Sequence, residues 1–138
     1  MAYFGTDVAY PSLEQICDIN RRMIERSEGW FVPPNNLLNQ GALEYILTDV
    51  INPDLDVTNH LALKEIAAKI SHQIIARHVF HDGNKRTAAH TAWEFLRANG
   101  VCVYLDSSII DLTDSIARGV GTINNFYSWL KEHQEPQI

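Results

Sequence analysis

Two strongly apolar helical segments lie on either side of a short polar stretch at residues 78–84. The first has a broad apolar face at helical spacing, which is typical of a buried central helix. That face consists of Leu61, Leu63, Ile66, Ala67, Ile70, Ile74 and Ile75. The second helix is expected from about Asn84 through Leu96, and Asn99-Gly100 is a good signal for its end. The pattern predicts a helical domain in which residues 78–84 form an irregular excursion between two core helices.

Further helices are expected on both sides of this pair. Ser12 is a suitable N-cap for the first of them, with Gln15 as its capping-box partner. The approximate ranges predicted from helical spacing are 13–27, 37–48, 108–118 and 122–132. Residues 101–105, VCVYL, are compatible with a short strand. The sequence therefore predicts an all-α fold, a compact helical bundle.

Residues 29–36, GWFVPPNN, cannot continue a helix because the paired prolines are incompatible with one. The segment combines aromatic side chains with turn-forming residues, so we expect an extended loop or a short β-hairpin. Loops held by a rigid scaffold commonly have a functional role. This segment and the 78–84 stretch are therefore both candidates for function.

At 138 residues the chain is expected to form one domain, residues 1–138, because it is too short for two ordinary domains. A formal net charge of -6 argues against direct nucleic-acid binding, so a phosphate site needs a local concentration of positive charge. The sequence has no signal-peptide pattern and no apolar run approaching the about 18 residues of a membrane span. We therefore expect a cytoplasmic protein with no membrane contact, in which Cys17 and Cys102 are buried, reduced thiols.

Residues 78–88, HVFHDGNKRTA, contain the groups that phosphoryl or nucleotidyl transfer needs. Unpaired amides at a helix start bind anions, and the glycine before this helix lets the backbone approach a ligand closely. Lys85 and Arg86 add positive charge, while Asp82 supplies a hard oxygen ligand for magnesium. His78 is the strongest general-base candidate, because imidazole exchanges a proton near neutral pH.

A purely structural interpretation also fits this spacing. In it, Asp82 caps the helix, Gly83 and Asn84 form a turn, and the two cations are solvated. The stretch is not a Walker loop, because no G-x-x-x-x-G-K precedes it. A transition-metal site is disfavoured, since the sequence has no H-E-x-x-H motif and its histidines are scattered. The histidines considered for such a site are His60, His72, His81 and His90.

The stretch HVFHDGNKRTA resembles the H-x-F-x-D-G-N-K-R-T-A signature of the Doc (death-on-curing) branch of the Fic family. The neighbouring sequence resembles the same family. AAHTAWEFLRANG follows the signature as in the family, NNLLNQGALEYIL resembles the segment after its substrate-binding flap, and SIARGVGTINNFYSWLKEH resembles its closing helices. The resemblance covers most of the chain, from about residue 10 to residue 133.

The resemblance implies a role for each matching residue. His78 matches the catalytic base, and Phe80 matches a buried aromatic that anchors the loop. Asp82 matches the magnesium ligand. The residues matching the anion-binding turn and the phosphate-contacting pair are Gly83, Asn84, Lys85 and Arg86. The segment near 29–36 matches a β-hairpin flap that pairs with an extended target segment, and its candidate target-binding residues are Trp30, Phe31 and Val32.

Three departures separate this sequence from the AMP-transferring Fic branch, which has H-P-F-x-x-G-N-G-R-x-x-R. Val79 replaces a proline, Lys85 replaces a glycine, and Ala89 replaces an arginine. The last two changes are shared with Doc, which resembles a kinase that transfers the γ-phosphate of ATP or another nucleoside triphosphate in the presence of magnesium. Phosphorylation is therefore favoured over the alternatives, a nucleotidyltransferase or a catalytically silent Fic-fold binding module.

In family terms, the target resembles elongation factor Tu, modified on a threonine so that translation stops. A separate antitoxin of the Phd type restrains such a toxin. Autoinhibited Fic proteins instead have a helix with the pattern [S/T]-x-x-x-E-[G/N], and Ser128 to Glu132 fits its first five positions. His133 fails the last position, so we interpret Glu132 as an ordinary surface residue.

Overall fold

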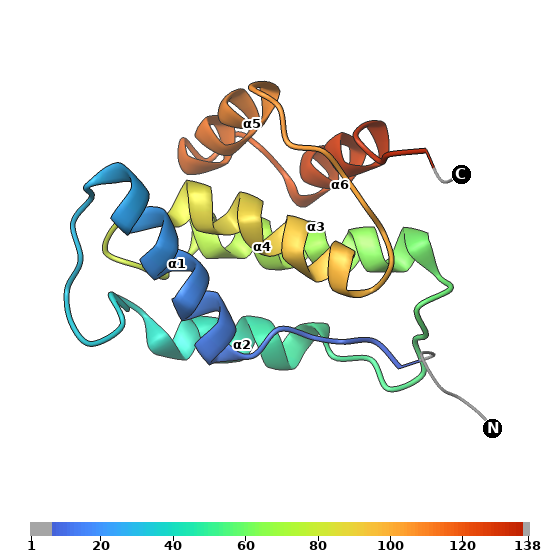
Figure 1. Ribbon diagram of the computed structural model, residues 1–138, viewed down its shortest axis with the longest axis horizontal. Helices are drawn as coiled ribbons and strands as arrows, with labels where there is room; N and C mark the ends of the chain where they lie inside the picture. The colour runs from blue at the N-terminus through green and yellow to red at the C-terminus, as the bar shows by residue number, and fades with distance from the viewer. Residues whose placement is uncertain (1–6, 137–138) are drawn as a thin grey trace.

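The computed structural model describes residues 7–136, in which six helices surround a single apolar core (Figure 1). They are α1 (Leu13–Ser27), α2 (Gln40–Val50), α3 (His60–Ala76), α4 (Asn84–Ala98), α5 (Ser108–Ala117) and α6 (Ile123–Glu132). The predicted all-α fold is confirmed, and each helix expected from the sequence is present within a few residues of its expected bounds.

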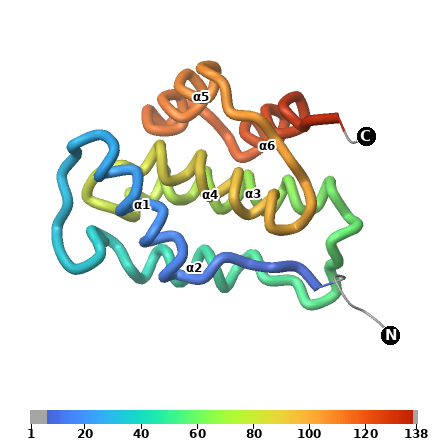
Figure 2. The backbone as a smooth tube through the Cα atoms, viewed as in Figure 1, coloured from blue at the N-terminus to red at the C-terminus, as the bar shows by residue number. Residues whose placement is uncertain are grey.

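Helices α3 and α4 form the centre of the molecule and make its most extensive helix–helix contact. Small residues on the facing surfaces, such as Ala68 and Ala88, let the two backbones come close, and the Ser71 hydroxyl donates to the Ala88 carbonyl at 2.8 Å. Figures 1 and 2 show α2 on one side of this pair and α5 and α6 on the other, while α1 packs on α4. The α3–α4 loop, residues 77–83, therefore lies at one end of the bundle.

Local capping explains where several helices begin. The predicted capping box of α1 is confirmed, because the Gln15 N–H donates to Ser12 Oγ and the Ser12 N–H donates to Gln15 Oε1. Helix α2 begins at Gln40, three residues later than expected. The amides of Leu38 and Asn39 instead donate to the Val79 carbonyl, which ties this segment to the α3–α4 loop.

The β-hairpin expected near residues 29–36 is wrong. This segment is a loop with a turn at 33–35. One backbone hydrogen bond joins two of its own residues, from the Asn36 N–H to the Val32 carbonyl at 2.7 Å. Pro33 and Pro34 have no N–H to donate to a ladder, and the Asn36 side chain takes the Val32 N–H that a partner strand would need. A single antiparallel bridge, Leu37 with Phe80, lies just beyond the loop.

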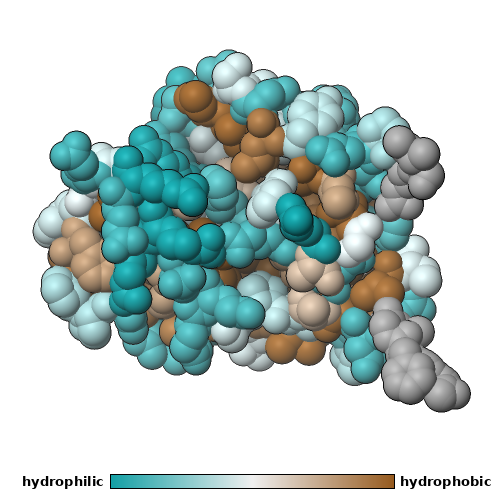
Figure 3. All heavy atoms as spheres, viewed as in Figure 1, coloured by the Kyte–Doolittle hydropathy of each residue, from teal (hydrophilic) through white to brown (hydrophobic). Residues whose placement is uncertain are grey.

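Two smaller expectations also change. Residues 101–105 contribute only an isolated bridge between Val103 and Gln134, and Cys102 is exposed rather than buried. None of the helices in residues 7–136 has both the length and the apolar character needed to cross a bilayer. Figure 3 shows hydrophilic side chains gathered over α1, whereas apolar side chains reach the surface beside α5.

Candidate active site

A cleft of about 470 Å³ opens at the α3–α4 loop, and this volume suits a small-molecule ligand. It is lined by Ser27, Gly29, Ile75, His78, His81, Asp82, Gly83, Asn84, Lys85, Arg86 and Ala117. These residues come from the end of α1, from the start of the 29–36 loop, from α3 and α4 with the loop between them, and from the end of α5. The cleft therefore brings together the predicted base, the predicted metal ligand and the predicted phosphate-binding residues.

His78 follows the last turn of α3 in a left-handed backbone conformation, with φ of 52°. The Val79 N–H donates to the Ile74 carbonyl and the His78 N–H donates to the Ile75 carbonyl, which together form a Schellman motif. Glycine is the usual residue at this left-handed position, so a histidine there is a strained choice. Its imidazole is exposed and has no hydrogen-bond partner within residues 7–136. The ring is therefore available to a ligand in the cleft.

Helix α4 begins without a side-chain cap, because Gly83 occupies the N-cap position with φ of 80°. A Cβ at Gly83 would lie 2.8 Å from Ile24 Cδ1 and 3.1 Å from Asn20 Nδ2, so α1 packs directly against the bare glycine. By contrast, side chains cap α1, α2, α3 and α6. The first amides of α4 and the helix dipole therefore remain available to an anion.

The Asn84 side chain has a structural role. It is buried, accepts from the Phe80 N–H at 2.9 Å and donates to the Phe80 carbonyl at 2.8 Å, as a partner strand would. Phe80 is fully buried in the core. This pair of hydrogen bonds fixes the α3–α4 loop on α4. Any contribution of Asn84 to ligand binding therefore falls to its backbone amide rather than to its carboxamide.

The Asp82 carboxylate lies between two backbone amides. Its Oδ1 accepts from the Gly83 N–H at 2.8 Å, and its Oδ2 accepts from the Trp30 N–H at 2.8 Å. A carboxylate oxygen has more than one acceptor site, so each oxygen retains capacity for a further ligand. Gly29 makes this approach possible, because a Cβ there would lie 2.8 Å from Asp82 Oδ2.

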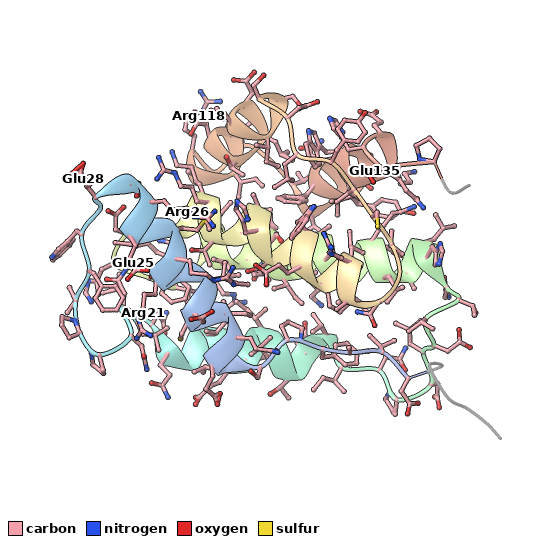
Figure 4. The ribbon with its side chains drawn as sticks, in the orientation of Figure 1. Arg21, Glu25, Arg26, Glu28, Arg118 and Glu135 are labelled. Carbon is pink, nitrogen blue, oxygen red and sulfur yellow. The ribbon has the colours of Figure 1, made fainter. Side chains whose placement is uncertain are left out.

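Lys85 and Arg86 are both exposed at the first turn of α4. Lys85 forms an ion pair with Asp114 of α5, with 2.6 Å between Nζ and Oδ1. Within the described part of the chain, Arg86 forms no ion pair or side-chain hydrogen bond. Figure 4 shows Arg26 of α1 and Arg118 after α5 on this side of the molecule, together with the acidic Glu25 and Glu28.

The 29–36 loop borders the cleft. The Trp30 side chain is 62% exposed, and its ring lies 5.3 Å from the ring of His81 between centroids. Phe31 is half-buried, with the Arg21 guanidinium over its ring. The N–H and carbonyl of Val32 are both used inside the loop. Among residues 7–136, the Phe31 N–H and carbonyl form no hydrogen bond, whereas both backbone groups of Val32 do.

Comparison with known proteins identifies the family. A family model described as Fic/DOC family matches residues 10–96, which is well over half of the 138-residue chain and includes the whole cleft segment of α3, α4 and their loop. The chain belongs to the Fic/DOC family. It is also 41% identical over 54 residues to a protein named Protein kinase doc from Escherichia phage P1. That alignment covers 39% of this chain and 43% of the phage protein, so it spans less than half the length of this relative.

The charged and polar residues of the cleft all lie within the region that the Fic/DOC model matches. Several residues that contact them were not predicted from the sequence. Asn20, Gly29 and Asn36 all contact Asp82 or its neighbours from outside the 78–88 stretch. Asp114 contacts Lys85 from α5. Of these residues, only Asn36 could have been suspected from the sequence, because it comes shortly after two prolines and asparagine favours left-handed turns. The structure gives it such a conformation, with φ of 60°.

Among residues 7–136, the autoinhibitory pattern of other Fic proteins has no counterpart at this cleft. Glu132 is exposed at the end of α6, and no residue of α6 lines the cleft. His133 packs instead on Trp129, with 3.7 Å between ring centroids, and contacts Asp106 at 3.0 Å. The last turn of α6 therefore packs on its own helix and on Asp106, outside the cleft.

The donor set of the cleft fits a magnesium ion that is shared with a phosphate ligand. Among residues 7–136, no three His, Cys, Asp or Glu side chains are placed to hold a metal between them. Asp82 alone offers carboxylate oxygens among the residues that line the cleft. Magnesium commonly binds one or two protein carboxylates and completes its octahedron with phosphate oxygens and water, and a single open carboxylate meets that requirement.

Proposed function

We propose that this chain is a Doc-type protein kinase, which transfers the γ-phosphate of a nucleoside triphosphate to a serine or threonine hydroxyl of a target protein. The observation that supports the proposal most strongly is the convergence of four groups on one cleft: the His78 imidazole, the Asp82 carboxylate and the two cations Lys85 and Arg86. They meet at a helix N-terminus with no side-chain cap.

In this proposal the triphosphate lies at the start of α4. The open amides of the first turn donate to phosphate oxygens, and Lys85 and Arg86 neutralise their charge. Asp82 would hold Mg²⁺, which when bound would offset the negative charge that develops during transfer. The hydrogen bonds from Gly83 and Trp30 keep the Asp82 carboxylate in a fixed orientation before any ligand arrives.

His78 acts as the general base. Its free ring nitrogen takes the proton from the target hydroxyl as the hydroxyl oxygen forms a bond to the γ-phosphorus. The bond between that phosphorus and the bridging oxygen of the β-phosphate breaks, and the nucleoside diphosphate leaves. The products are a phosphorylated side chain, a nucleoside diphosphate and a proton, initially on His78.

Two side chains favour γ-phosphate transfer over nucleotidyl transfer. Lys85 extends from the first turn of α4, where a glycine would leave the backbone open to an α-phosphate. Ala89 is buried in α4 and provides no second guanidinium to hold a reversed triphosphate. Both differences are ones that the resemblance assigns to the Doc branch rather than to the AMP-transferring branch.

The proposed target and partner are those that the resemblance to Doc implies. Elongation factor Tu is the target to test first, with a threonine as the acceptor and arrest of translation as the result, and such a target requires the cytoplasmic location expected from the sequence. A toxin of this kind requires a Phd-type antitoxin, encoded beside it. The exposed Trp30 ring and the open Phe31 backbone are the proposed contacts for the target segment.

Radiolabel transfer to elongation factor Tu tests the proposal directly. Label from γ-³²P-ATP with magnesium is expected to appear on the target, and His78→Ala is expected to abolish it. His60→Ala, which removes an imidazole outside the cleft, is the control and is expected to keep full transfer. Label arriving from α-³²P-ATP would show nucleotidyl transfer and contradict the proposal, and label from neither nucleotide would contradict both.

A further inference from the structure

Two asparagines from different parts of the chain meet under the cleft. Asn20 of α1 and Asn36 of the 29–36 loop are both fully buried, and Asn36 Nδ2 donates to Asn20 Oδ1 at 3.0 Å. Buried carboxamides destabilise a fold unless their polar atoms are paired. Here the remaining atoms are paired: Asn20 Nδ2 also donates to the Thr87 hydroxyl at 3.0 Å, and Asn36 Oδ1 accepts from the Val32 N–H at 2.8 Å.

Both asparagines also donate to the same backbone oxygen. The Asp82 carbonyl accepts from Asn20 Nδ2 at 2.9 Å and from Asn36 Nδ2 at 3.3 Å. The carbonyl of Asp82 and the N–H of Gly83 belong to one planar peptide, so the two groups point in opposite directions. Fixing the oxygen therefore fixes the N–H, and that N–H is the group that donates to Asp82 Oδ1.

Asn36 also closes the loop that borders the cleft. Its N–H donates to the Val32 carbonyl, and its own carbonyl accepts from the His81 N–H at 2.9 Å. The opposite end of the loop is tied to the same aspartate through the Trp30 N–H. The 29–36 loop is thus connected to Asp82 at both ends, by the carboxylate at one end and by the peptide carbonyl at the other.

We infer that Asn20 and Asn36 form a positioning pair that sets the Asp82–Gly83 peptide and couples it to the 29–36 loop. The functional part of this inference rests on the proposed kinase function, because it takes Asp82 as the magnesium ligand and the loop as the target-binding segment. Occupancy of the metal site and order in the loop are then linked, since the same pair holds both. Neither asparagine touches the reacting groups.

Replacing Asn36 with aspartate tests the pair. Asn36→Asp keeps the side-chain size and the left-handed turn, but it removes both Nδ2 hydrogen bonds and turns an acidic group toward Asn20 Oδ1. Asn99→Asp is the matched control, because Asn99 is a buried asparagine on the opposite end of α4 whose Nδ2 donates to the carbonyls of Ala9 and Phe95. Asn36→Gly keeps the left-handed backbone without adding charge, and it serves as the second variant if Asn36→Asp does not fold.

Hydrogen–deuterium exchange of the free protein gives a readout that needs no ligand. The Trp30 and Gly83 amides, which donate to Asp82, are expected to lose protection in Asn36→Asp or Asn36→Gly and to keep it in Asn99→Asp. Unchanged protection in the Asn36 variant would overturn the inference whether or not the protein proves to be a kinase. Equal loss in Asn99→Asp would overturn it as well, because the effect would then be general destabilisation.

Calorimetric titration with Mg²⁺ at a fixed concentration of ADP tests the link to the site. Substitutions that disturb the partners of a metal ligand typically weaken metal binding by about 10-fold to 100-fold, and we expect a loss of at least about 10-fold in Asn36→Asp and none in Asn99→Asp. Equal affinity in wild type and Asn36→Asp would overturn the inference. If wild type itself does not bind Mg-ADP, the kinase proposal and the link to the metal site both fail, while the exchange experiment still decides whether the pair positions the Asp82–Gly83 peptide.

Discussion

Lys85 of α4 and Asp114 of α5 form an ion pair across one edge of the cleft, with 2.6 Å between Nζ and Oδ1. The hydrogen bond from Lys85, together with its positive charge, holds the pKa of the Asp114 carboxyl below its ordinary value. Both side chains are about half exposed, so the pair is screened by solvent. A cation proposed to bind phosphate is thus already partnered, and a phosphate must compete with Asp114 for it.

Releasing Lys85 is expected to strengthen nucleotide binding. Because this ion pair is exposed and screened by solvent, Asp114→Asn is expected to lower the dissociation constant for Mg-ADP only modestly, by no more than about five-fold. Calorimetric titration at low ionic strength measures this change. Asp111→Asn removes a charge from the same helix without breaking an ion pair to Lys85 and is expected to have a smaller effect. Weaker binding in Asp114→Asn would show that Asp114 orients Lys85 rather than competing for it.

Because the backbone of His78 is left-handed, we expect this residue to lower the stability of the fold while being required for phosphate transfer. A non-glycine residue in this conformation costs about 1 kcal/mol, which glycine avoids. His78→Gly is therefore expected to raise the free energy of unfolding by roughly 0.5–1 kcal/mol in urea titrations while abolishing phosphate transfer. His78→Ala keeps the strain and is expected to lose transfer without gaining stability. A less stable His78→Gly would show that the imidazole contributes contacts that the structure does not reveal.

Local signals in the sequence predicted much of this fold. Helical spacing located all six helices, and the Ser12–Gln15 capping box marked the start of α1 correctly. The groups that line the cleft were also recognisable, because nine consecutive residues, 78–86, contain the imidazole, the carboxylate and both cations. Features set by neighbours in the sequence were therefore accessible before the structure.

Features that depend on distant residues were not accessible. Asn20 lies 62 positions before Asp82, and Asn36 lies 46 positions before it, so neither contact has a signature in the local pattern. The hairpin expectation failed partly because of such distant contacts and partly because of side chains inside the segment. The turn formers at 33–36 were recognised, but the Asn36 side chain and the α3–α4 loop take the hydrogen-bonding groups that a second strand would have used.

Gly29 is expected to be essential for the geometry of Asp82. A Cβ there would lie 2.8 Å from Asp82 Oδ2 and 3.1 Å from Ile24 Cδ1, so Gly29→Ala must displace the carboxylate or the loop. We expect a loss of about 1–3 kcal/mol in the free energy of unfolding and about 10-fold weaker binding of Mg-ADP.

Gly41→Ala provides the comparison for this substitution. Gly41 lies in the first turn of α2, and the nearest atom to its added Cβ is 4.0 Å away. Alanine is the better helix former by up to about 1 kcal/mol, so this variant is expected to gain stability and bind Mg-ADP normally. Chemical denaturation and calorimetric titration measure both properties. Normal binding in Gly29→Ala would show that the Asp82 carboxylate can move without loss.

The environment of His90 predicts how the free energy of unfolding depends on pH. Burial, followed by the positive charge of Arg26, lowers the pKa of this imidazole from its ordinary value of 6.5. Below that value the unfolded chain binds a proton that the folded protein resists, so the free energy of unfolding is expected to fall as the pH falls. Urea titrations between about pH 7.5 and about pH 5.5 measure the slope. His90→Gln is expected to flatten it, whereas His60→Gln is expected to leave it close to wild type. A slope that survives in His90→Gln would assign the pH dependence to another group.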